Sequence, residues 1–393
     1  MKNLIVIALA FIASIHSISQ LPRILVPFRS GNKWGYSDTL GKIKIQPVYD
    51  SVSLFNYNAI YNGNHVIATV RFKGKPTAIN EMGTVMVPPK YDDIRLIEIL
   101  GELKDLAFFV FKNGKVGVYT KGKELFPTIY DYMDVSPGVQ FKVHRNGKWG
   151  LINSEGIIVI PVIYDDLRQI YSNNNPGFIN WEAITYGKES KSYIIKEEQG
   201  NGSSQIPPPL EELRDGLSQE RLSKAIDSVK TEHGFDSVLI KKNSAIIYKG
   251  TKQGVFLPGE VKKIYFFSKD YTLHHIKYFN PYERNNWNNF SAIYIIVNLN
   301  GKYGIINETE KQVLPFNYDS IEEKDGFFLL KRNGKTGFFT WNSFYPAIQP
   351  VYDKYVSKEY IPVNNEWNFT LFKVVKNGKP GFVGENGIAF FKD

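Results

Sequence analysis

One short motif recurs along this chain, and it constrains the fold more than any other feature of the sequence. Its clearest copy begins at Asn146 and reads N-G-K-W-G-L-I-N, then Glu155-Gly156, then I-I-V-I-P, and ends at Tyr164-Asp165. The same frame recurs at residues 31–50, 74–92, 114–131, 301–319 and 334–353, and a last copy starts at Gly378-Lys379 and stops at Asp393. Self-similarity of this kind is the sequence signature of a repeat architecture.

The separation between the lysine and the tyrosine of the motif is nearly constant. It is 16, 16, 15, 16, 16 and 17 residues for Lys33–Tyr49, Lys75–Tyr91, Lys115–Tyr130, Lys148–Tyr164, Lys302–Tyr318 and Lys335–Tyr352. The intervals between successive lysines vary more, at 42, 40 and 33 residues in the first block and 33 and 44 in the second. The sequence therefore predicts a rigid module with connections of variable length.

Each part of the module predicts a local structure. Asn-Gly before the lysine favours a tight hairpin turn, because both residues tolerate the positive φ that such a turn requires. In the clearest copy, the stretches 140–143, 149–152 and 157–160 read as three strands. We expect Pro161 to end the third strand, because proline has no N–H for the ladder. The aspartate after the tyrosine then accepts backbone N–H groups at a corner.

A second glycine follows the lysine by two residues and lies inside a strand pattern. Such a glycine indicates a bulge or a close approach of another backbone, and we expect an aromatic side chain of an adjacent unit to lie across it. The positions are Gly35, Gly117, Gly150, Gly304, Gly337 and Gly381. The second copy has Pro76-Thr77 instead, so it should be the least regular unit of the first block.

Residues 1–19 have the layout of a secretory signal peptide. Lys2 precedes an apolar run over 4–15, and the small residues Ser17 and Ser19 precede an expected cut before Gln20. The run is about 12 residues long, shorter than the roughly 20 that a membrane-spanning helix needs; a buried N-terminal strand is the alternative. We expect an exported protein, periplasmic, on the cell surface or secreted, with no membrane span.

Composition excludes several classes of chemistry. The chain has no cysteine, which excludes disulfides, a thiolate nucleophile, a cysteine-ligated zinc and a lipid anchor on cysteine. The formal net charge is +9, and removal of Lys2 with the signal leaves +8. Because the charges are interspersed, with no block of five or more Lys/Arg, and because the protein is expected to be exported, nucleic acid is not an expected partner.

The middle of the chain, residues 173–297, keeps only traces of the frame, such as Gly187-Lys188 with Ile206-Pro207. Residues 200–204 read as a flexible loop and 207–209 as a stiff, extended triple proline. Apolar residues at helical spacing predict an amphipathic helix over 218–233, capped by Ser218 and ended by Gly234. The organisation is then a signal peptide (1–19), four repeats (20–172), this degenerate middle, and two repeats with a truncated last one (298–393).

The frame resembles the bacterial WG-repeat family, also called WG-containing or KWG repeats. The best matches are Lys33-Trp34-Gly35, Lys148-Trp149-Gly150 and Lys302-Tyr303-Gly304, each with its Tyr-Asp pair. The resemblance covers 30–172 and 298–393 well, with Val116, Thr336 and Pro76 replacing the aromatic residue. It implies a shared architecture and frequent export, and no common catalytic activity.

Two architectures fit three short strands per repeat: an open superhelical array of antiparallel three-stranded β-meanders, or a closed β-propeller. Propeller blades usually have four strands in about 40–45 residues, so the 33-residue intervals are short. The chain also begins with a first strand (24–28) and ends after a third strand (388–391), so neither end needs a strand from the other. We therefore favour the mainly β, open array.

The sequence contains no recognisable catalytic, cofactor or metal motif. His274 and His275 are adjacent, so in a strand they point to opposite faces and do not share a metal ion. The doublets Asp92-Asp93 and Asp165-Asp166 follow repeat tyrosines, which favours corner capping over paired acid–base carboxylates or a calcium site. We expect no enzyme; an enzyme would need a pocket of titratable groups in the degenerate middle.

Two sets of residues remain as binding candidates. The turn lysines should align as a basic stripe, unless they are merely solvated or form salt links to neighbouring Tyr-Asp carboxylates. Aromatic residues, 15% of the chain, should mostly fill the core, and some should be exposed on a concave face. The candidates are Lys33, Trp34, Lys115, Lys148, Trp149, Lys302, Tyr303 and Lys335. The favoured function is a protein-binding scaffold of the bacterial envelope or exterior; the alternative is a module for acidic glycans.

Overall fold

The structure is a computed structural model. The described residues are 24–56, 66–97, 106–136, 140–170, 178–196, 226, 234–240, 245–257, 263–278, 293–307, 309–340, 345–363 and 368–393. They form 34 strands in nine sheets, which we name A to I in chain order. The expectation of a mainly β protein is confirmed.

The first five sheets come from the first half of the chain, except for one strand of sheet A that comes from its end. Sheet A consists of β1 (Val26–Ser30), β2 (Lys33–Ser37), β3 (Ile43–Tyr49) and β34 (Phe391–Lys392); sheet B of β4 (Ser51–Val52), β5 (Ile67–Phe72), β6 (Lys75–Asn80) and β7 (Val85–Val87); sheet C of β8 (Asp93–Leu96), β9 (Ala107–Lys112), β10 (Lys115–Thr120) and β11 (Lys123–Tyr130); sheet D of β12 (Tyr132–Ser136), β13 (Gln140–Arg145), β14 (Lys148–Ile152) and β15 (Ile158–Tyr164); sheet E of β16 (Asp166–Ile170), β17 (Phe178–Ile184) and β18 (Lys191–Lys196).

The other four sheets come from the second half. Sheet F consists of β19 (Ser237–Ile240), β20 (Ala245–Lys249), β21 (Lys252–Leu257) and β22 (Lys263–Phe266); sheet G of β23 (Thr272–Tyr278), β24 (Ile293–Leu299), β25 (Lys302–Ile306) and β26 (Gln312–Tyr318); sheet H of β27 (Ser320–Lys324), β28 (Phe327–Arg332), β29 (Lys335–Phe339) and β30 (Ile348–Tyr352); sheet I of β31 (Lys354–Pro362), β32 (Asn368–Lys376) and β33 (Lys379–Gly384).

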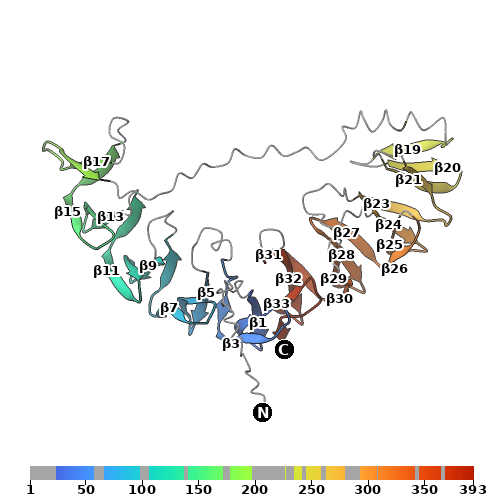
Figure 1. Cartoon of the computed structure of the whole chain (residues 1–393), viewed down its shortest axis with the longest axis horizontal. Helices are drawn as coiled ribbons and strands as arrows, with labels where there is room; N and C mark the ends of the chain where they lie inside the picture. The colour runs from blue at the N-terminus through green and yellow to red at the C-terminus, as the bar shows by residue number, and fades with distance from the viewer. Residues whose placement is uncertain are drawn as a thin grey trace, which may run out of the picture.

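The nine sheets follow one another along an open arc (Figure 1). Both ends of the described chain lie at the middle of the arc; sheets A to E run to one tip, and sheets F to I lead from the other tip back to the middle. Strands such as β7, β11, β26 and β30 lie on the convex rim, and β27 and β31 lie nearer the concave side (Figure 1). The described sheets close neither a barrel nor a propeller, as we expected for the favoured architecture.

The expectation of three strands per sheet is wrong for most sheets. In six of the nine, a fourth strand precedes the predicted three, and in sheet A the fourth strand is β34. The reason is that the chain turns at the Tyr-Asp corner and pairs at once with the next hairpin, as where Asp93–Leu96 lines up with β9 or Tyr132–Ser136 with β13. The corner residues thus start the next sheet as its innermost strand.

Pro161 does not end the third strand, contrary to our expectation. β15 continues through it to Tyr164, and β3 likewise continues through Pro47 to Tyr49. These strands lie at the edge of their sheets, where a residue without an N–H leaves no partner unbonded. The proline is therefore an edge residue, and the strand ends at the tyrosine.

The second glycine lies at a bulge, as expected. In sheet H the register shifts between Thr336 and Phe338, on either side of Gly337, and a Cβ on Gly337 would lie 2.3 Å from the carbonyl oxygen of Ile348. The group that lies across the glycine is therefore the backbone of the same module's third strand. Our expectation of an aromatic ring from an adjacent unit is wrong here, although rings of the same module do approach Gly304 and Gly381.

Buried side chains fill the spaces between successive sheets. Between sheets C and D, Val118 and Phe126 belong to the same buried cluster as Phe141 and Val143. The largest of the fully buried side chains are aromatic, among them Trp181. Each sheet is too small to bury both faces alone, and stacking provides the burial that rings of this size supply.

The two arms of the arc are joined by the last residues of the chain. β34 pairs parallel with β1, while Phe390 donates its N–H to the carbonyl of Phe382 in β33. The buried side chain of Arg29 forms an ion pair with Asp393 at 2.7 Å and donates to the carbonyl of Pro380, also at 2.7 Å. Our expectation that neither end needs a strand from the other is therefore wrong.

Several expectations fall on residues outside those described. These are the signal peptide (1–19), the flexible loop (200–204), the triple proline (207–209) and the helix (218–233), of which the structure describes Ile226 alone. Ile226 is buried in one cluster with Phe235, Ala245, Ile247 and Phe256. Among the described residues, no helix has the length and apolar character to cross a membrane.

Candidate functional site: a repeated lysine–aspartate clasp

The turn lysine of each regular module binds the aspartate at the end of the same module. Nζ to Oδ1 distances are 2.5 Å for Lys33–Asp50, 2.7 Å for Lys75–Asp92 and 2.6 Å for Lys302–Asp319. The pairs Lys115–Asp131, Lys148–Asp165 and Lys335–Asp353 have the same geometry. The carboxylate partner that we considered for these lysines is confirmed, with the difference that it lies in the same module and not next door.

The second oxygen of the same aspartate reaches the hairpin turn of the following module. Oδ2 of Asp50 accepts the N–H of Gly74 at 2.7 Å, Oδ2 of Asp92 accepts that of Asn113 at 2.9 Å, and Oδ2 of Asp319 accepts that of Asn333 at 2.7 Å. We call this arrangement the clasp: one carboxylate binds its own turn lysine and the next turn. It sets successive sheets in a fixed relation, which is the repeated feature of the arc.

The clasps stabilise the charged form of the aspartates. The pKa of Asp319 is lowered by the hydrogen bond from the Lys302 ammonium first and by that from the Asn333 N–H second. The same two causes lower the pKa of Asp50, Asp92 and Asp131. Because both groups that donate to the carboxylate favour its ionised form, the clasp is intact wherever the aspartate is ionised.

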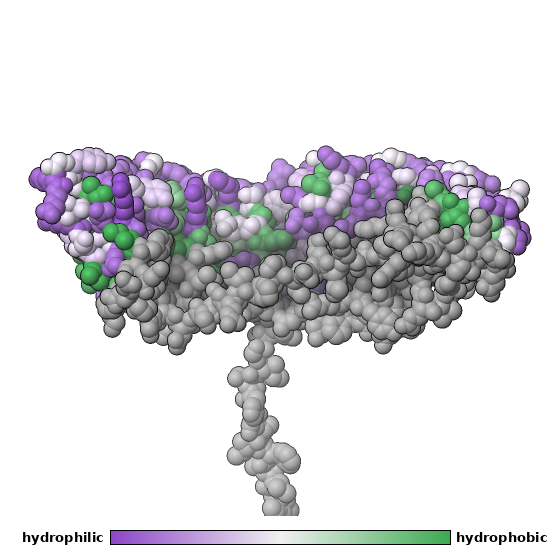
Figure 2. Space-filling view, turned by 90° about the horizontal axis from the view of Figure 1, so that it is seen from above, coloured by the Kyte–Doolittle hydropathy of each residue, from purple (hydrophilic) through white to green (hydrophobic). Residues whose placement is uncertain are grey.

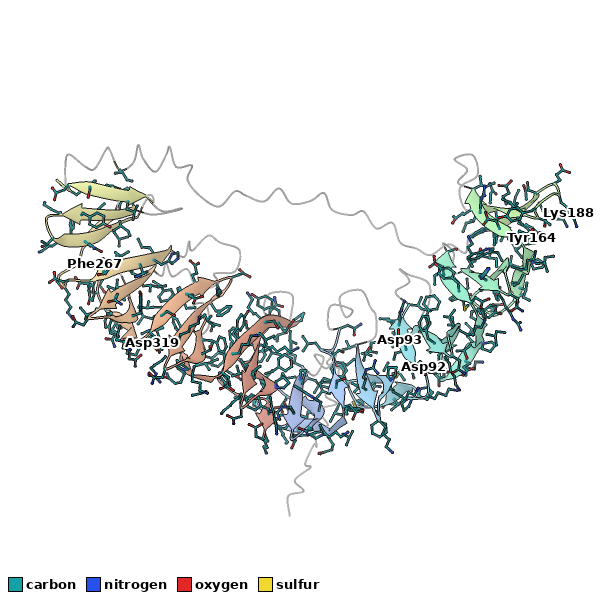
Figure 3. The ribbon with its side chains drawn as sticks, turned by 180° about the vertical axis from the view of Figure 1, so that it is seen from behind. Asp92, Asp93, Tyr164, Lys188, Phe267 and Asp319 are labelled. Carbon is teal, nitrogen blue, oxygen red and sulfur yellow. The ribbon has the colours of Figure 1, made fainter. Side chains whose placement is uncertain are left out.

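The tyrosine beside each clasp is buried between sheets. Tyr91 donates its hydroxyl to Glu124 Oε1 of sheet C at 2.7 Å, and the hydroxyls of Tyr164 and Tyr193 are 2.6 Å apart. Burial raises the pKa of Tyr352 to about 12. Figure 3 shows Tyr164 on sheet D near the tip of the arc, next to Lys188 of sheet E. The tyrosine is thus an anchor between one sheet and the next.

The aromatic candidates at the position after the lysine are all partly buried. The Trp34 ring meets Phe382 across the junction of sheets A and I, with centroids 6.2 Å apart. Tyr303 bonds His274 Nε2 at 2.9 Å. Trp149 lies in a surface cluster with Tyr132 and His144, and the Lys142 ammonium lies 4.4 Å from its ring centroid. The structure therefore distributes these rings along the arc and does not bring them to one site.

The histidine pair and the aspartate doublets behave as structural groups. His274 binds Tyr303 while Nε2 of His275 lies against the carboxylate of Glu323, so the two rings have different neighbours. Asp93, beside the clasp residue Asp92 (Figure 3), accepts the N–H of Ile94 at 2.9 Å. Corner capping was our prediction for these doublets, and the geometry agrees with it. No cluster of three potential metal ligands occurs among the described residues.

Sequence reasoning missed the joint of the two arms. Arg29 precedes the first turn, and Asp393 is the last residue of the chain; neither is part of the repeat frame that identified the lysines. The only available signal was that the last module stops before its P-x-x-Y-D, which left its third strand free to take another partner. The roles of the eight candidate residues in binding stay predictions.

The profile of the family described as "WG containing repeat" matches four regions of the chain, residues 34–75, 77–98, 149–175 and 303–335. These regions contain the clasp aspartates Asp50, Asp92, Asp165 and Asp319, and they leave out the Lys115–Asp131 pair of sheet C. No curated protein matches the chain.

Solved structures of other proteins align with most of the chain at low similarity. "Crystal structure of the eukaryotic initiation factor" has 11% identity and a TM-score of 0.28, and the alignment covers 92% of this chain and 93% of that one. Apo AztD from Citrobacter koseri has 11% identity and a TM-score of 0.22, covering 81% and 92%. Sqt1 of Saccharomyces cerevisiae has 10% identity and a TM-score of 0.20, covering 84% and 90%. Superpositions at these scores define neither the arrangement of the sheets nor a function.

Proposed function

We propose that this chain, four regions of which match the WG-containing repeat family, is an exported, non-catalytic scaffold that binds other proteins at the bacterial envelope or exterior. The observation that carries this proposal is the clasp, which recurs at equivalent positions and holds small sheets in a continuous array. Repeat arrays of this kind present long surfaces to partners. The turn lysines are engaged in the clasp, which supports a structural role for them.

The experiment is a binding measurement with the chain that begins at Gln20. The purified protein is immobilised, bound proteins are identified from envelope extracts, and the strongest candidate is then titrated as a purified protein. We expect saturable binding that survives treatment of the partner with glycosidases. The absence of any protein that saturates the surface would contradict the proposal.

Export has its own test. Expression of the full chain in a bacterial host, followed by mass measurement of the protein outside the cytoplasm, should give the mass of a chain that begins at Gln20. A full-length chain that stays in the cytoplasm would contradict export and leave the binding proposal to be tested inside the cell.

A second candidate function rests on the Trp149 cluster. Tyr132 is 49% exposed, its ring lies 5.9 Å from that of Trp149, and Lys142 supplies a positive charge beside them. Exposed rings stack on sugar rings, and a cation attracts acidic sugars. Binding of acidic polysaccharide that weakens with salt and is lost in Tyr132→Ala would favour this function; equal binding by Tyr132→Ala would remove it.

A further inference from the structure

Sheet E lacks the outer strand that completes most other sheets. Its order is β16-β17-β18, whereas sheet D has β12-β13-β14-β15. By position in the order, β18 corresponds to β14, whose outer side is covered by β15. The outer side of β18 pairs with no strand among the described residues, and the backbone N–H and C=O groups on such a side are of the kind that another strand can pair with.

The neighbouring sheet D has an exposed apolar position at the place that a missing strand would cover. The residue before the repeat tyrosine is Ile129 in sheet C, and it packs against the core shared with the complete sheet D. The equivalent residue in sheet D is Ile163, next to the incomplete sheet E, and it is 59% exposed. Figure 2 shows hydrophobic surface at the left end of the arc, the end with β15 and β17 in Figure 1.

The same relation holds elsewhere in the arc. Val48 precedes Tyr49 and is 45% exposed next to sheet B, whose outer strand has only three residues. Val351 precedes Tyr352 and is also 45% exposed, next to sheet I, whose outer side has a single bridge at Val383–Ala389. Among the four aliphatic residues at this position, the exposed fraction is greatest at Ile163, next to the sheet without an outer strand among the described residues.

The edge strand β18 lacks the proline that is found in most outer strands of the other sheets. Proline occurs within β3, β11, β15, β26 and β30, and proline on an edge discourages pairing with another chain. β18 reads KSYIIK and has none. Its Ile194 is 66% exposed on the face opposite Tyr193 and Ile195, which pack toward sheet D.

We propose that the outer edge of β18, with the exposed Ile163 beside it, binds an extended strand of a partner protein by β-strand addition. Such complexes derive affinity from main-chain hydrogen bonds and specificity from alternate side chains. β18 contains two lysines and no acidic residue, so the strand that fits has an apolar centre and acidic ends. Two copies of β18 would bring four lysines together, which disfavours self-pairing. The inference rests on the proposed protein-binding function and specifies its site.

The test uses synthetic twelve-residue peptides and the chain that begins at Gln20. One peptide has alternating Val and Thr with glutamates at both ends, the second has lysines at the ends, and the third is the acidic peptide N-methylated at alternate residues. Fluorescence anisotropy should show saturable binding of the acidic peptide and, for the other two, affinity lower by about tenfold or more, because charge pairing or main-chain hydrogen bonds are lost. Equal affinity for the acidic and N-methylated peptides overturns the proposal.

Matched substitutions on β15 locate the site. Ile163→Asp should lower affinity for the acidic peptide by about tenfold or more, whereas Ile158→Asp should not. Ile158 is similarly exposed, at 58%, and pairs with Ile152 at the other end of the strand. Wild-type affinity in Ile163→Asp, with both variants folded by circular dichroism, overturns the proposal.

Other occupants of the edge give distinct results. If deletion of residues 200–209 raises peptide affinity about tenfold, the chain's own segment holds the edge, and the proposed partner is wrong. If the protein is a dimer that Ile163→Asp dissociates, the occupant is a second copy and the proposal is also wrong. If wild type and Ile163→Asp capture the same protein equally well, the proposed scaffold function is supported. The proposed binding site at β18 and Ile163 is then wrong.

Discussion

The aspartate of each module accepts two different donors, and this double use is the main property of the molecule at the scale of single residues. One oxygen binds the lysine that opened the module, and the other binds the turn that opens the next, as in Asp319 with Lys302 and Asn333. The ion pair is exposed, so by itself it adds little to stability. Its effect comes from geometry, because a single carboxylate fixes two turns.

The clasp makes stability depend on pH in the acid range. The pKa of Asp319 is lowered from 3.8 in the folded protein, so its contribution is present above about pH 4 and is lost as the pH falls through the lowered pKa. We predict that Asp319→Asn lowers the unfolding temperature at pH 7 and that the difference from wild type narrows near pH 3. Thermal unfolding of both proteins at pH 7 and pH 3 measures this difference in unfolding temperature. A difference that is the same at both pH values would contradict the role of the aspartate's charge.

The second glycine allows close contact with the third strand. A Cβ at Gly337 would lie 2.3 Å from the oxygen of Ile348 and 2.7 Å from the carbonyl carbon of Gln349. We predict that Gly337→Ala destabilises the protein by about 1–3 kcal/mol, because the backbone must move apart. Urea unfolding measures it, and Val351→Ala, on an exposed side chain of the same sheet, should stay within about 0.5 kcal/mol of wild type. An equal effect of both substitutions would refute the close approach.

The repeat tyrosines should ionise late. Burial raises the pKa of Tyr352 from 10.0 to about 12. The neutral form is favoured in the fold, so this contribution is complete below pH 10 and is lost as the pH rises through about 12. We predict that the difference in absorbance at 295 nm between wild type and Tyr352→Phe develops near pH 12. A midpoint near 10 in folded protein would show that the hydroxyl is not buried.

At the scale of elements, the repeat frame predicted the hairpins well. Asn146 and Gly147 both have positive φ, at 52° and 75°, as the Asn-Gly signal indicates. The repeat frame predicted the ends of strands poorly, because Pro161 alone indicates the end of a strand. Pro161 is compatible with the hydrogen-bond ladder only because β15 lies at the edge of its sheet. The inner strands were missed because segments such as 51–52 and 93–96 are only two and four residues long.

The seam at β34 is the element on which the union of the two arms depends. The N–H of Arg29 donates to the carbonyl of Phe390 and the N–H of Gly31 to that of Lys392, both at 3.0 Å. We predict that deletion of residues 390–393 increases the radius of gyration in X-ray scattering and speeds proteolysis, because these bonds and the Arg29–Asp393 pair are lost. Lys392→Ala keeps the backbone bonds and should behave as wild type; an unchanged radius in the deletion would show that the arms are joined in another way.

The candidate site was predictable in part. The lysine and the aspartate were both visible in the frame, and their separation of 16 to 18 residues spans the second strand of the hairpin and the third strand. The contact between Asp319 and Asn333 of the next module was not predictable, because it depends on how one sheet stacks on the next. The exposed edge of β18 was hidden for the same reason, since the sequence there shows only a fading of the repeat.

At the scale of the whole molecule, the order of the sheets along the arc differs from their order along the sequence. The chain starts at the centre of the arc, and the degenerate middle of the sequence supplies both tips, sheets E and F (Figure 1). Repeats of good consensus lie toward the centre, where each sheet has two neighbours. The tips have one neighbour each, and there the sequence departs from the frame, as is usual for terminal units of repeat arrays.

The open arc is tested most directly by the distance between its tips. The chain has no cysteine, so Ser192→Cys in β18 and Ser237→Cys in β19 would carry the only two spin labels, on exposed residues of sheets E and F. Pulsed electron paramagnetic resonance should give a mean distance far beyond the ~10 Å spacing of sheets packed face to face. A short, narrow distance distribution that places sheets E and F as packed neighbours would contradict the account, because the array would then be a closed ring.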